Sequence, residues 1–277
     1  MIKAKNPQNQ ILPIWQPVGY STYQITSAVA QKYGMKATHT GVLDPLAEGV
    51  ILVLLGSERF NKSKFTDFHK EYEFEISLGI ATDSYDGMGL ITEYNNGSEK
   101  LTLGDLQLVV KGFVGDYTQK VPLYSARKVN SKKLFLYPKE KLTIPELPEK
   151  SGKIYKIECS DLGNSKLYSL VDEIIAKIEQ VKKGEYRQKE IIQNWKEFKS
   201  KNTNWDVQTA AFCAELSRGL YVRSLSQDIV KKLGKIGFVS KLVRTGNGEY
   251  TKENSCTLNE LFGENFDHEM LLSKFTM

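Results

Sequence analysis

The most informative segment of the chain is His39-Thr40-Gly41-Val42-Leu43-Asp44-Pro45-Leu46-Ala47-Glu48-Gly49. Its glycines and its Asp-Pro pair are typical of turns, and the apolar run Val50–Leu55 that follows indicates a buried strand. Taken alone, Asp44-Pro45 is typical of a helix start, because aspartate is a good N-cap and proline suits the first helical position. Taken alone, His39 would be a histidine at the surface or at the edge of a core.

Short strands and helices are predicted on both sides of this segment. Ile11–Trp15 is apolar enough for a strand, and Ser21-Thr22 can cap a helix that runs to about Lys32. Tyr72–Leu78 alternates in polarity, which predicts a half-buried strand. Further strands are expected at Leu90–Tyr94, Tyr117–Val121, Ile154–Cys159 and Val207–Leu216, and helices at Leu103–Val110 and Tyr221–Lys232. Adjacent strands with occasional helices favour an α/β or α+β mixed sheet over a regular parallel one.

Residues 163–204 differ in character from their surroundings. Apolar residues from Leu167 to Val181 recur at helical spacing, and a lysine-rich polar stretch follows them to Asn204. We interpret this region as a helical insertion between two strands. A solvated helical decoration is the simpler interpretation, and RNA contact through basic residues is the alternative. Those basic residues are Lys177, Lys182, Lys183, Arg187, Lys189, Lys196, Lys199 and Lys201.

The composition is that of an ordinary globular protein. The 277 residues are 40% hydrophobic and 26% charged, and the formal net charge is +5. This mild positive charge fits a polyanionic partner without requiring one. The three cysteines are scattered without a CxxC pair, which disfavours a disulfide framework and a zinc knuckle. No secretory signal is visible, and Val50–Leu55 is too short to span a bilayer, so we expect a cytoplasmic protein without a membrane partner.

Several common catalytic motifs are missing from the sequence. It has neither a GxGxxG fingerprint nor a GxxxxGK[ST] phosphate loop, and it has no GxSxG elbow. The histidines His39, His69 and His268 show no metal-ligand spacing. If the chain is an enzyme, we therefore expect it to work without a nucleotide cofactor or a metal ion.

A family resemblance rests on six blocks in the family's order. His39–Gly49 resembles GHTGTLDPxAxGVL, the signature of the TruB family of pseudouridine synthases. The order of the blocks, which together cover roughly residues 12–250, makes the resemblance specific. The other five resemble the family's KPxGxTS, KxYxxxxxLGxxTDTxDxxG, PPxYSAxKxxG, CSxGTYIRSL and LRRT blocks, and they lie at Gln16–Thr22, Lys70–Gly87, Val121–Asn130, Ser217–Leu225 and Leu242–Thr245.

The resemblance implies a fold and an activity. The fold would be the α+β pseudouridine synthase fold, a mixed, mostly antiparallel central sheet flanked by helices and loops. Residues 1–250 would form the catalytic domain with the insertion at 163–204, and residues 251–277 would be a short C-terminal tail without a full PUA domain. The chain would act as a monomer on the T-arm of tRNA. It would convert the T-loop uridine at tRNA position 55 into pseudouridine without a cofactor.

The resemblance also assigns roles to individual residues. Asp44 would be the catalytic carboxylate, acting as nucleophile at C1′ or as base at C2′. Arg223 would be the cation that keeps it ionised in a closed site. Each assignment competes with a plain structural role: a solvated helix residue for Arg223 and core packing for the aromatic and aliphatic residues. The remaining assignments are Tyr72 for base stacking and proton transfer, Tyr221 and Leu242 for the base pocket, and His39 for insertion into the RNA loop.

The sequence also departs from the family pattern. Basic residues that could contact phosphates are Lys62, Lys64, Lys70, Arg127, Lys128, Lys132 and Lys133. Residues that differ from the usual family residue are Gln16, Thr38, Val42, Glu48, Leu220 and Val243. The alternatives to a tRNA-modifying enzyme are a guide-RNA-directed enzyme of the dyskerin-like branch, an RNA-binding or tRNA-folding protein with little catalysis, and a basic protein unrelated to RNA.

Overall fold

The computed structural model describes residues 9–97, 99–181, 184 and 186–263. These residues form two compact units, which we describe separately. Unit 1 takes its residues from Met1–Tyr72, Lys177–Glu185 and Leu242–Met277, and unit 2 from Glu73–Ala176 and Tyr186–Lys241. Two strands, β4 (Lys70–Leu78) and β12 (Gly237–Asn247), and one helix, α5 (Leu167–Gln180), contribute residues to both units.

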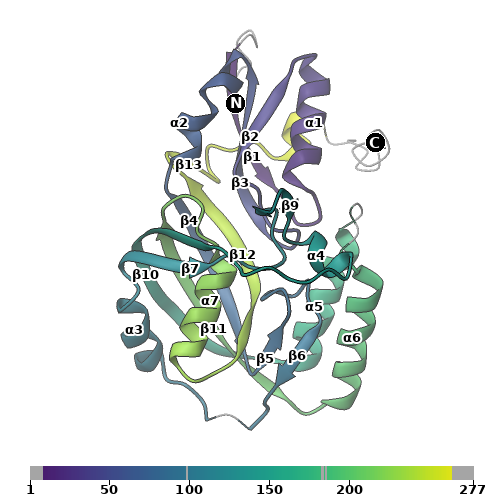
Figure 1. Cartoon of the computed structure of the whole chain (residues 1–277), viewed down its shortest axis with the longest axis vertical. Helices are drawn as coiled ribbons and strands as arrows, with labels where there is room; N and C mark the ends of the chain where they lie inside the picture. Colours follow the sequence, from purple (N-terminus) through teal and green to yellow (C-terminus); the bar gives the residue numbers. More distant parts are fainter. Residues whose placement is uncertain (1–8, 98, 182–183, 185, 264–277) are drawn as a thin grey trace. The chain divides into compact units, whose positions relative to one another are not determined.

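Unit 1 is built around β3 (Glu48–Gly56), which contains the apolar run that follows the Asp-Pro segment and is buried except at its two end residues (Figure 1). Strand β1 runs antiparallel along β3, β2 also pairs antiparallel with it, and Val243 and Arg244 of β12 pair with it in parallel. The elements are β1 (Asn9–Gln16), α1 (Thr22–Tyr33), β2 (Ala37–Thr40), β3 (Glu48–Gly56), the short 3₁₀ helix η1 (Ser57–Asn61), α2 (Lys62–Thr66), β13 (Tyr250–Thr251) and α8 (Leu258–Phe262).

Helix α1 begins where the sequence predicts it. Ser21 accepts a hydrogen bond from the backbone of Gln24, and the Gln24 side chain accepts one from the backbone of Ser21. This capping box satisfies two backbone donors that the first helical turn leaves open. Gly34 ends the helix with φ of 62°, a left-handed conformation that glycine adopts without steric cost. Buried residues of α1, among them Ile25 and Val29, join the apolar residues of β1 and β3 in one core cluster.

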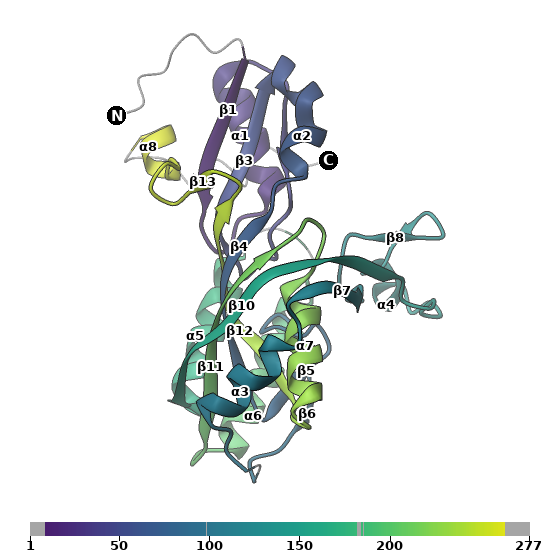
Figure 2. The ribbon, with the colours of Figure 1, turned by 90° about the vertical axis from the view of Figure 1, so that its left-hand side faces the viewer.

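Unit 2 combines a sheet with helices and a projecting segment. Helices α3 and α7 pack together against β7 and β10, and β8, β9 and α4 project from the ends of β7 and β10 (Figure 2). The elements are β5 (Ile80–Thr82), β6 (Ile91–Tyr94), α3 (Leu103–Lys111), β7 (Gly115–Lys120), β8 (Lys128–Val129), β9 (Lys132–Lys133), α4 (Leu136–Lys139), β10 (Glu149–Lys166), α6 (Gln188–Lys201), β11 (Asp206–Leu216) and α7 (Val222–Lys232).

The strand order confirms the predicted α+β class. In unit 1 the order is β1-β3-β12, and in unit 2 it continues from β12 as β4-β11-β10-β7. The β12–β3 pairing is parallel, whereas β1–β3, β10–β11 and β7–β10 are antiparallel. The sheet is therefore mixed and mostly antiparallel, as predicted.

The region 163–204 differs from the predicted decoration. Strand β10 continues to Lys166, well past the predicted end at Cys159, because it pairs with β11 along this length. Two helices follow, α5 and α6, and α6 buries Trp195 completely. The Trp195 ring lies 5.4 Å from that of Phe238 on β12, between ring centroids. Helix α6 is therefore part of the core of unit 2 and not a solvated addition. Within the described residues, no helix is long and apolar enough to cross a membrane.

Candidate active site

Asp44 lies in a tight turn and does not start a helix. The backbone N–H of Ala47 donates to the carbonyl of Asp44 at 3.0 Å, with Pro45 at the second position of the turn, where its fixed φ is favourable. The chain then leads directly into β3 at Glu48. The helix-cap interpretation of Asp44-Pro45 is therefore wrong. The Asp44 side chain is half-buried, whereas Leu43 and Ala47 on either side belong to the core of unit 1.

The first sequence block holds this turn in place. The Thr22 hydroxyl donates to Gln16 Oε1 at 2.7 Å and accepts from the backbone N–H of Leu43 at 3.3 Å. The N–H of Gly19 donates to the carbonyl of Pro45 at 3.3 Å. Gln16 and Thr22 are fully buried, so each of these bonds replaces hydration that is lost on folding. The departure Gln16, where the family has lysine, thus supplies an uncharged partner for Thr22.

His39 lies on β2 in a half-buried position beside two cations. Burial, together with the charges of Lys62 and Arg244, lowers the pKa of His39 to about 4. The imidazole is therefore neutral at physiological pH, and its flat ring is suited to stacking. Lys62 is anchored close by, with its Nζ donating to the Thr38 hydroxyl at 3.4 Å.

Arg244 is a buried cation that the sequence did not single out. It is 2% exposed, its Nε donates to the carbonyl of Val50 at 2.8 Å, and its backbone pairs with Gly49 in the parallel β3–β12 ladder. A Cβ on Gly41 would lie 3.2 Å from Arg244 Nη1, so the glycine leaves room for the guanidinium. The Leu242–Thr245 block contains this arginine, but its burial depends on a pairing between distant segments.

Arg223 in unit 2 is held by three oxygen-bearing groups. It is 3% exposed, which excludes the solvated helix arginine considered as its alternative. Its Nη1 donates to the carbonyl of Ser84 at 2.8 Å and its Nη2 to the carbonyl of Tyr124 at 3.1 Å. Its Nε lies 3.6 Å from Asp86 Oδ2. These partners fix the plane and direction of the guanidinium.

Asp86 is itself oriented by its loop. Its Oδ1 accepts from the Ser84 hydroxyl at 2.6 Å and from the backbone N–H of Met88 at 2.9 Å. The sequence block Lys70–Gly87 contains Asp86, but sequence reasoning gave it no role. A paired carboxylate beside a buried arginine offsets part of the cost of burying the charge.

The other predicted site residues, Tyr221, Tyr72 and Leu242, are partly buried. Tyr221 is half-buried at the N-terminus of α7, where its backbone N–H donates to Gln119 Oε1 at 2.6 Å and its side chain packs against the cluster of Val121, Leu134 and Tyr137. Tyr72 is a half-buried residue of β4. Leu242 is partly buried against the core cluster that contains Leu43.

The predicted site residues are divided between the two units. His39, Asp44, Tyr72 and Leu242 belong to unit 1, whereas Tyr221 and Arg223 belong to unit 2.

One of the basic residues considered for phosphate contact, Lys70, is buried. Lys70 is 6% exposed, and its Nζ donates to the backbone carbonyls of Thr66, at 2.8 Å, and of Phe68. It therefore has a structural role. Arg127, Lys128 and Lys133 are exposed, and Lys132 pairs with Glu140. In the described part of the chain, no group of three or more histidine, cysteine, aspartate or glutamate residues could hold a metal ion, and His268, Lys182 and Lys183 lie outside it.

The family model of the TruB family pseudouridylate synthase N-terminal domain matches residues 28–187. The chain belongs to the TruB family. A relative named tRNA pseudouridine synthase B, from Caldanaerobacter subterraneus subsp. tengcongensis, is 31% identical over 253 residues, which cover 91% of this chain and 73% of the relative. Relatives of the same name from Oceanobacillus iheyensis and Aquifex aeolicus are each 29% identical, over 89% and 96% of this chain and 68% and 78% of their own lengths.

Solved structures support the same fold for this TruB family chain. A Cbf5-Nop10-Gar1 complex contains a chain with a TM-score of 0.58 and 21% identity, and the match covers 92% of this chain and 54% of that one. An H/ACA RNP bound to a substrate RNA containing 2′-deoxyuridine gives 0.55 and 17%, with 93% and 58% covered. This chain therefore spans little more than half of those chains. At such low identity the likeness shows the fold alone.

Proposed function

We propose that this chain isomerises uridine to pseudouridine in tRNA, with Asp44 as its catalytic carboxylate. The observation that carries the proposal is the family match over residues 28–187, which includes the Asp44 turn, together with relatives named tRNA pseudouridine synthase B that align over about nine-tenths of the chain. We also propose residues 1–250 as the catalytic domain.

The reaction is an exchange of bonds within one nucleotide. The bond between C1′ and N1 breaks, a bond between C1′ and C5 forms, the proton on C5 is lost, and N1 gains a proton. Electrons are neither gained nor lost overall, so the protein has to supply positioning, charge stabilisation and proton transfer. A carboxylate beside the sugar can promote this exchange as a nucleophile at C1′ or as a base at C2′.

The proposed roles follow from the family motifs and the local environments. Arg223 would keep Asp44 ionised, since a buried guanidinium held by fixed partners stays charged and favours a carboxylate. The two residues belong to different units, so this pairing rests on the family motifs. Tyr72 would stack on the flipped base and assist proton transfer, with the base pocket completed by Tyr221 and Leu242. The neutral His39 ring would stack in the RNA loop.

The proposed target is the T-loop uridine at tRNA position 55, bound through the T-arm by a monomer. The support is the set of ordered blocks that resemble the family signature, above all His39–Gly49. The exposed basic residues Arg127, Lys128 and Lys133 of the projecting segment suit a phosphate backbone.

The deciding experiment measures tritium release from C5-labelled uridine in unmodified tRNA transcripts. We expect release by the wild-type chain and a loss of more than about 10³-fold for Asp44→Asn, at the scale of a lost acid–base or nucleophilic group. Binding of tRNA should survive in that variant. Asp116→Asn, which changes an exposed carboxylate on β7, serves as the matched control and should keep full activity. Tight tRNA binding without release by the wild type would instead indicate a tRNA-folding protein.

A further inference from the structure

Arg187, in the inserted region 163–204, forms a bidentate ion pair with Asp83. Its Nη1 donates to Asp83 Oδ2 at 2.9 Å and its Nη2 donates to Asp83 Oδ1 at 3.2 Å. Both side chains are partly buried, with 30% of Arg187 and 23% of Asp83 exposed. Parallel hydrogen bonds of this kind fix orientation as well as charge, which is the property in which arginine differs from lysine.

Tyr124 completes this cluster. Its hydroxyl donates to Asp83 Oδ2 at 3.0 Å, and the Arg187 guanidinium carbon lies 4.6 Å from the centre of its ring. Burial and the Asp83 carboxylate raise the pKa of Tyr124 to about 12, so the phenol remains a donor at physiological pH. Arg187 therefore contacts the Asp83 carboxylate and also the ring of Tyr124, whose hydroxyl donates to that carboxylate.

The backbone of Arg187 is strained. Its φ of 62° and ψ of 28° place it in the left-handed region, where a Cβ lies too close to the following carbonyl oxygen. The residue is also the N-cap of α6, and its carbonyl accepts from the N–H of Ile191 at 2.9 Å. The contacts of the folded chain must offset this strain. Strained residues of this kind cluster at functional sites.

Helix α6 makes two further contacts, one with the loop between β5 and β6 and one with the first residue of β6. The indole N–H of Trp195 donates to the carbonyl of Gly87 at 3.1 Å, and the Asn194 side chain accepts from the N–H of Ile91 at 2.9 Å. Together with Arg187, these contacts bind α6 to the loop between β5 and β6 and to the start of β6.

This loop and Tyr124 are also the groups that hold Arg223. Ser84, next to Asp83, accepts from Arg223 through its carbonyl, and Tyr124 does the same. The side chains of Asp83 and Tyr124 thus contact Arg187, while the backbone carbonyls of Ser84 and Tyr124 accept hydrogen bonds from Arg223. A shift of either group would move an acceptor of Arg223.

We infer that Arg187 is a positioning residue for the reaction: by binding Asp83 and Tyr124 from the inserted helix α6, it fixes the carbonyls that orient Arg223. This role rests on the proposed function. It also assigns a use to the inserted region other than RNA contact, because the guanidinium of Arg187 is already engaged by a carboxylate and an aromatic ring.

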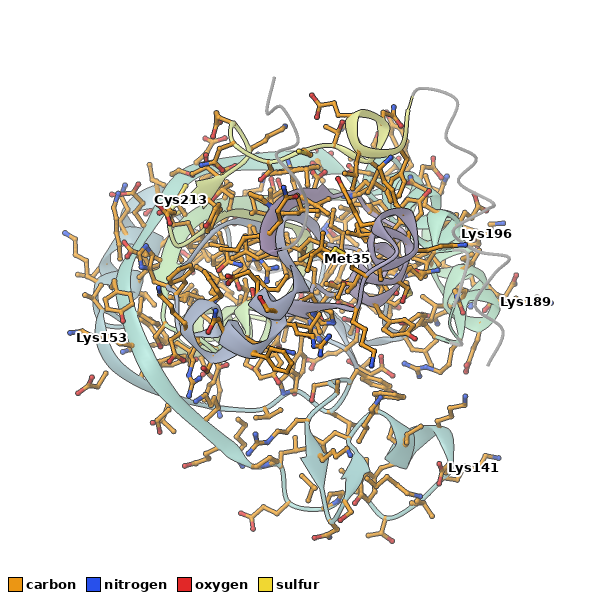
Figure 3. The ribbon with its side chains drawn as sticks, turned by 90° about the horizontal axis from the view of Figure 1, so that it is seen from above. Met35, Lys141, Lys153, Lys189, Lys196 and Cys213 are labelled. Atoms are coloured by element: carbon orange, nitrogen blue, oxygen red, sulfur yellow. The ribbon has the colours of Figure 1, made fainter. Side chains whose placement is uncertain are left out.

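The test compares single-turnover rates of pseudouridine formation with tRNA binding. For Arg187→Gln we expect the rate at saturating tRNA to fall between about 10-fold and 100-fold, the scale of a small misplacement of a catalytic group, with unchanged tRNA affinity. Arg187→Lys keeps the charge but not the paired hydrogen bonds, and should have an intermediate rate. Lys189→Gln is the matched control, because Lys189 is exposed and points outward from α6, as Figure 3 shows, and it should keep the wild-type rate.

Several outcomes separate this role from others. Weaker tRNA binding with a normal saturated rate would overturn it in favour of RNA contact. A lowered melting temperature with a normal rate per folded molecule would overturn it in favour of a purely structural role. Adding Asp83→Asn to Arg187→Gln should cause little further loss, since both changes break one linkage.

If Arg187→Gln does not fold, Tyr124→Phe removes only the phenol bond to Asp83 and should give a smaller loss of the same kind; a normal rate would then overturn the inference. A wild-type chain that forms no pseudouridine would defeat the proposed function and this inference with it. An active wild type with a fully active Arg187→Gln would defeat the inference alone.

Discussion

At the scale of residues, the candidate site relies on polar side chains that hold backbone. Thr22 fixes the N–H of Leu43 immediately before Asp44, and Arg223 is held mainly by the carbonyls of Ser84 and Tyr124. Backbone acceptors cannot change rotamer, so they orient a side chain at low entropic cost. Substitutions in these supports should therefore change the rate more than the affinity for RNA.

His39 gives a prediction about pH. Its pKa in the folded chain is about 4, against 6.5 ordinarily, so the unfolded chain binds more protons between these values. The free energy of unfolding should therefore fall as the pH is lowered from about 6.5 to about 4, by up to about 3 kcal/mol in total, and this contribution should be constant below that range. Urea unfolding of the wild type and of His39→Gln at a series of pH values measures it. The variant should lack this component, and an identical pH dependence in both proteins would contradict the assignment.

At the scale of elements, the parallel junction of β3 and β12 depends on Gly49. Its φ is 133°, and a Cβ there would lie 2.6 Å from the backbone N of Arg244 and even closer to its carbonyl oxygen. Gly49→Ala should therefore force the two strands apart and cost more than the roughly 1–3 kcal/mol of backbone strain alone. Urea unfolding measures the loss.

Gly34→Ala is the matched control for this junction. Gly34 also has a positive φ, 62°, but nothing lies within 4 Å of a Cβ added there, so only strain of roughly 1–2 kcal/mol is expected. Equal losses in Gly34→Ala and Gly49→Ala would show that the close approach of β12 does not matter.

The elements also show what local sequence can and cannot predict. The helix start at Ser21-Thr22, the buried strand Val50–Leu55 and the α+β class were predicted, because each depends on residue type and spacing over a few positions. The extension of β10 past Cys159 was missed, since its residues are polar and only pairing with β11 makes them a strand.

The features of the candidate site also differ in how far the sequence alone could predict them. The roles of Asp44 and Arg223 come from the family resemblance and stay predictions. The helix-cap interpretation, which rested on local residues alone, failed because it ignored the strand that follows within four residues. The Asp83–Arg187 pair, 104 residues apart in sequence, has no local signal at all. The pair forms only in the folded chain, because helix α6 brings an arginine from the insertion onto the β5–β6 loop.

At the scale of the whole molecule, fold similarity and sequence identity bear differently on which RNA the chain modifies. The fold matches chains from the Cbf5-Nop10-Gar1 complex and an H/ACA RNP, but one fold hosts several modes of substrate delivery. Sequence identity reaches 31% with a relative named tRNA pseudouridine synthase B, against 21% and 17% with those chains. Direct recognition of tRNA, without a guide RNA, is what we propose for this chain.

The last prediction follows from direct recognition. The purified chain alone, without guide RNA or accessory proteins, should convert one uridine in a full tRNA transcript and in the isolated T-arm hairpin, because a base-flipping enzyme reads its target within the loop that presents it. An anticodon-arm hairpin and a transcript with the T-loop uridine changed to cytidine are the controls and should stay unmodified. Sequencing of the modified positions, with tritium release for the yield, measures the outcome. Modification only after guide RNA and partner proteins are added would place the chain in the dyskerin-like branch. Modification of full tRNA but not of the hairpin would keep tRNA as the substrate and show that the T-arm alone is insufficient, since recognition would then extend to the rest of the folded tRNA.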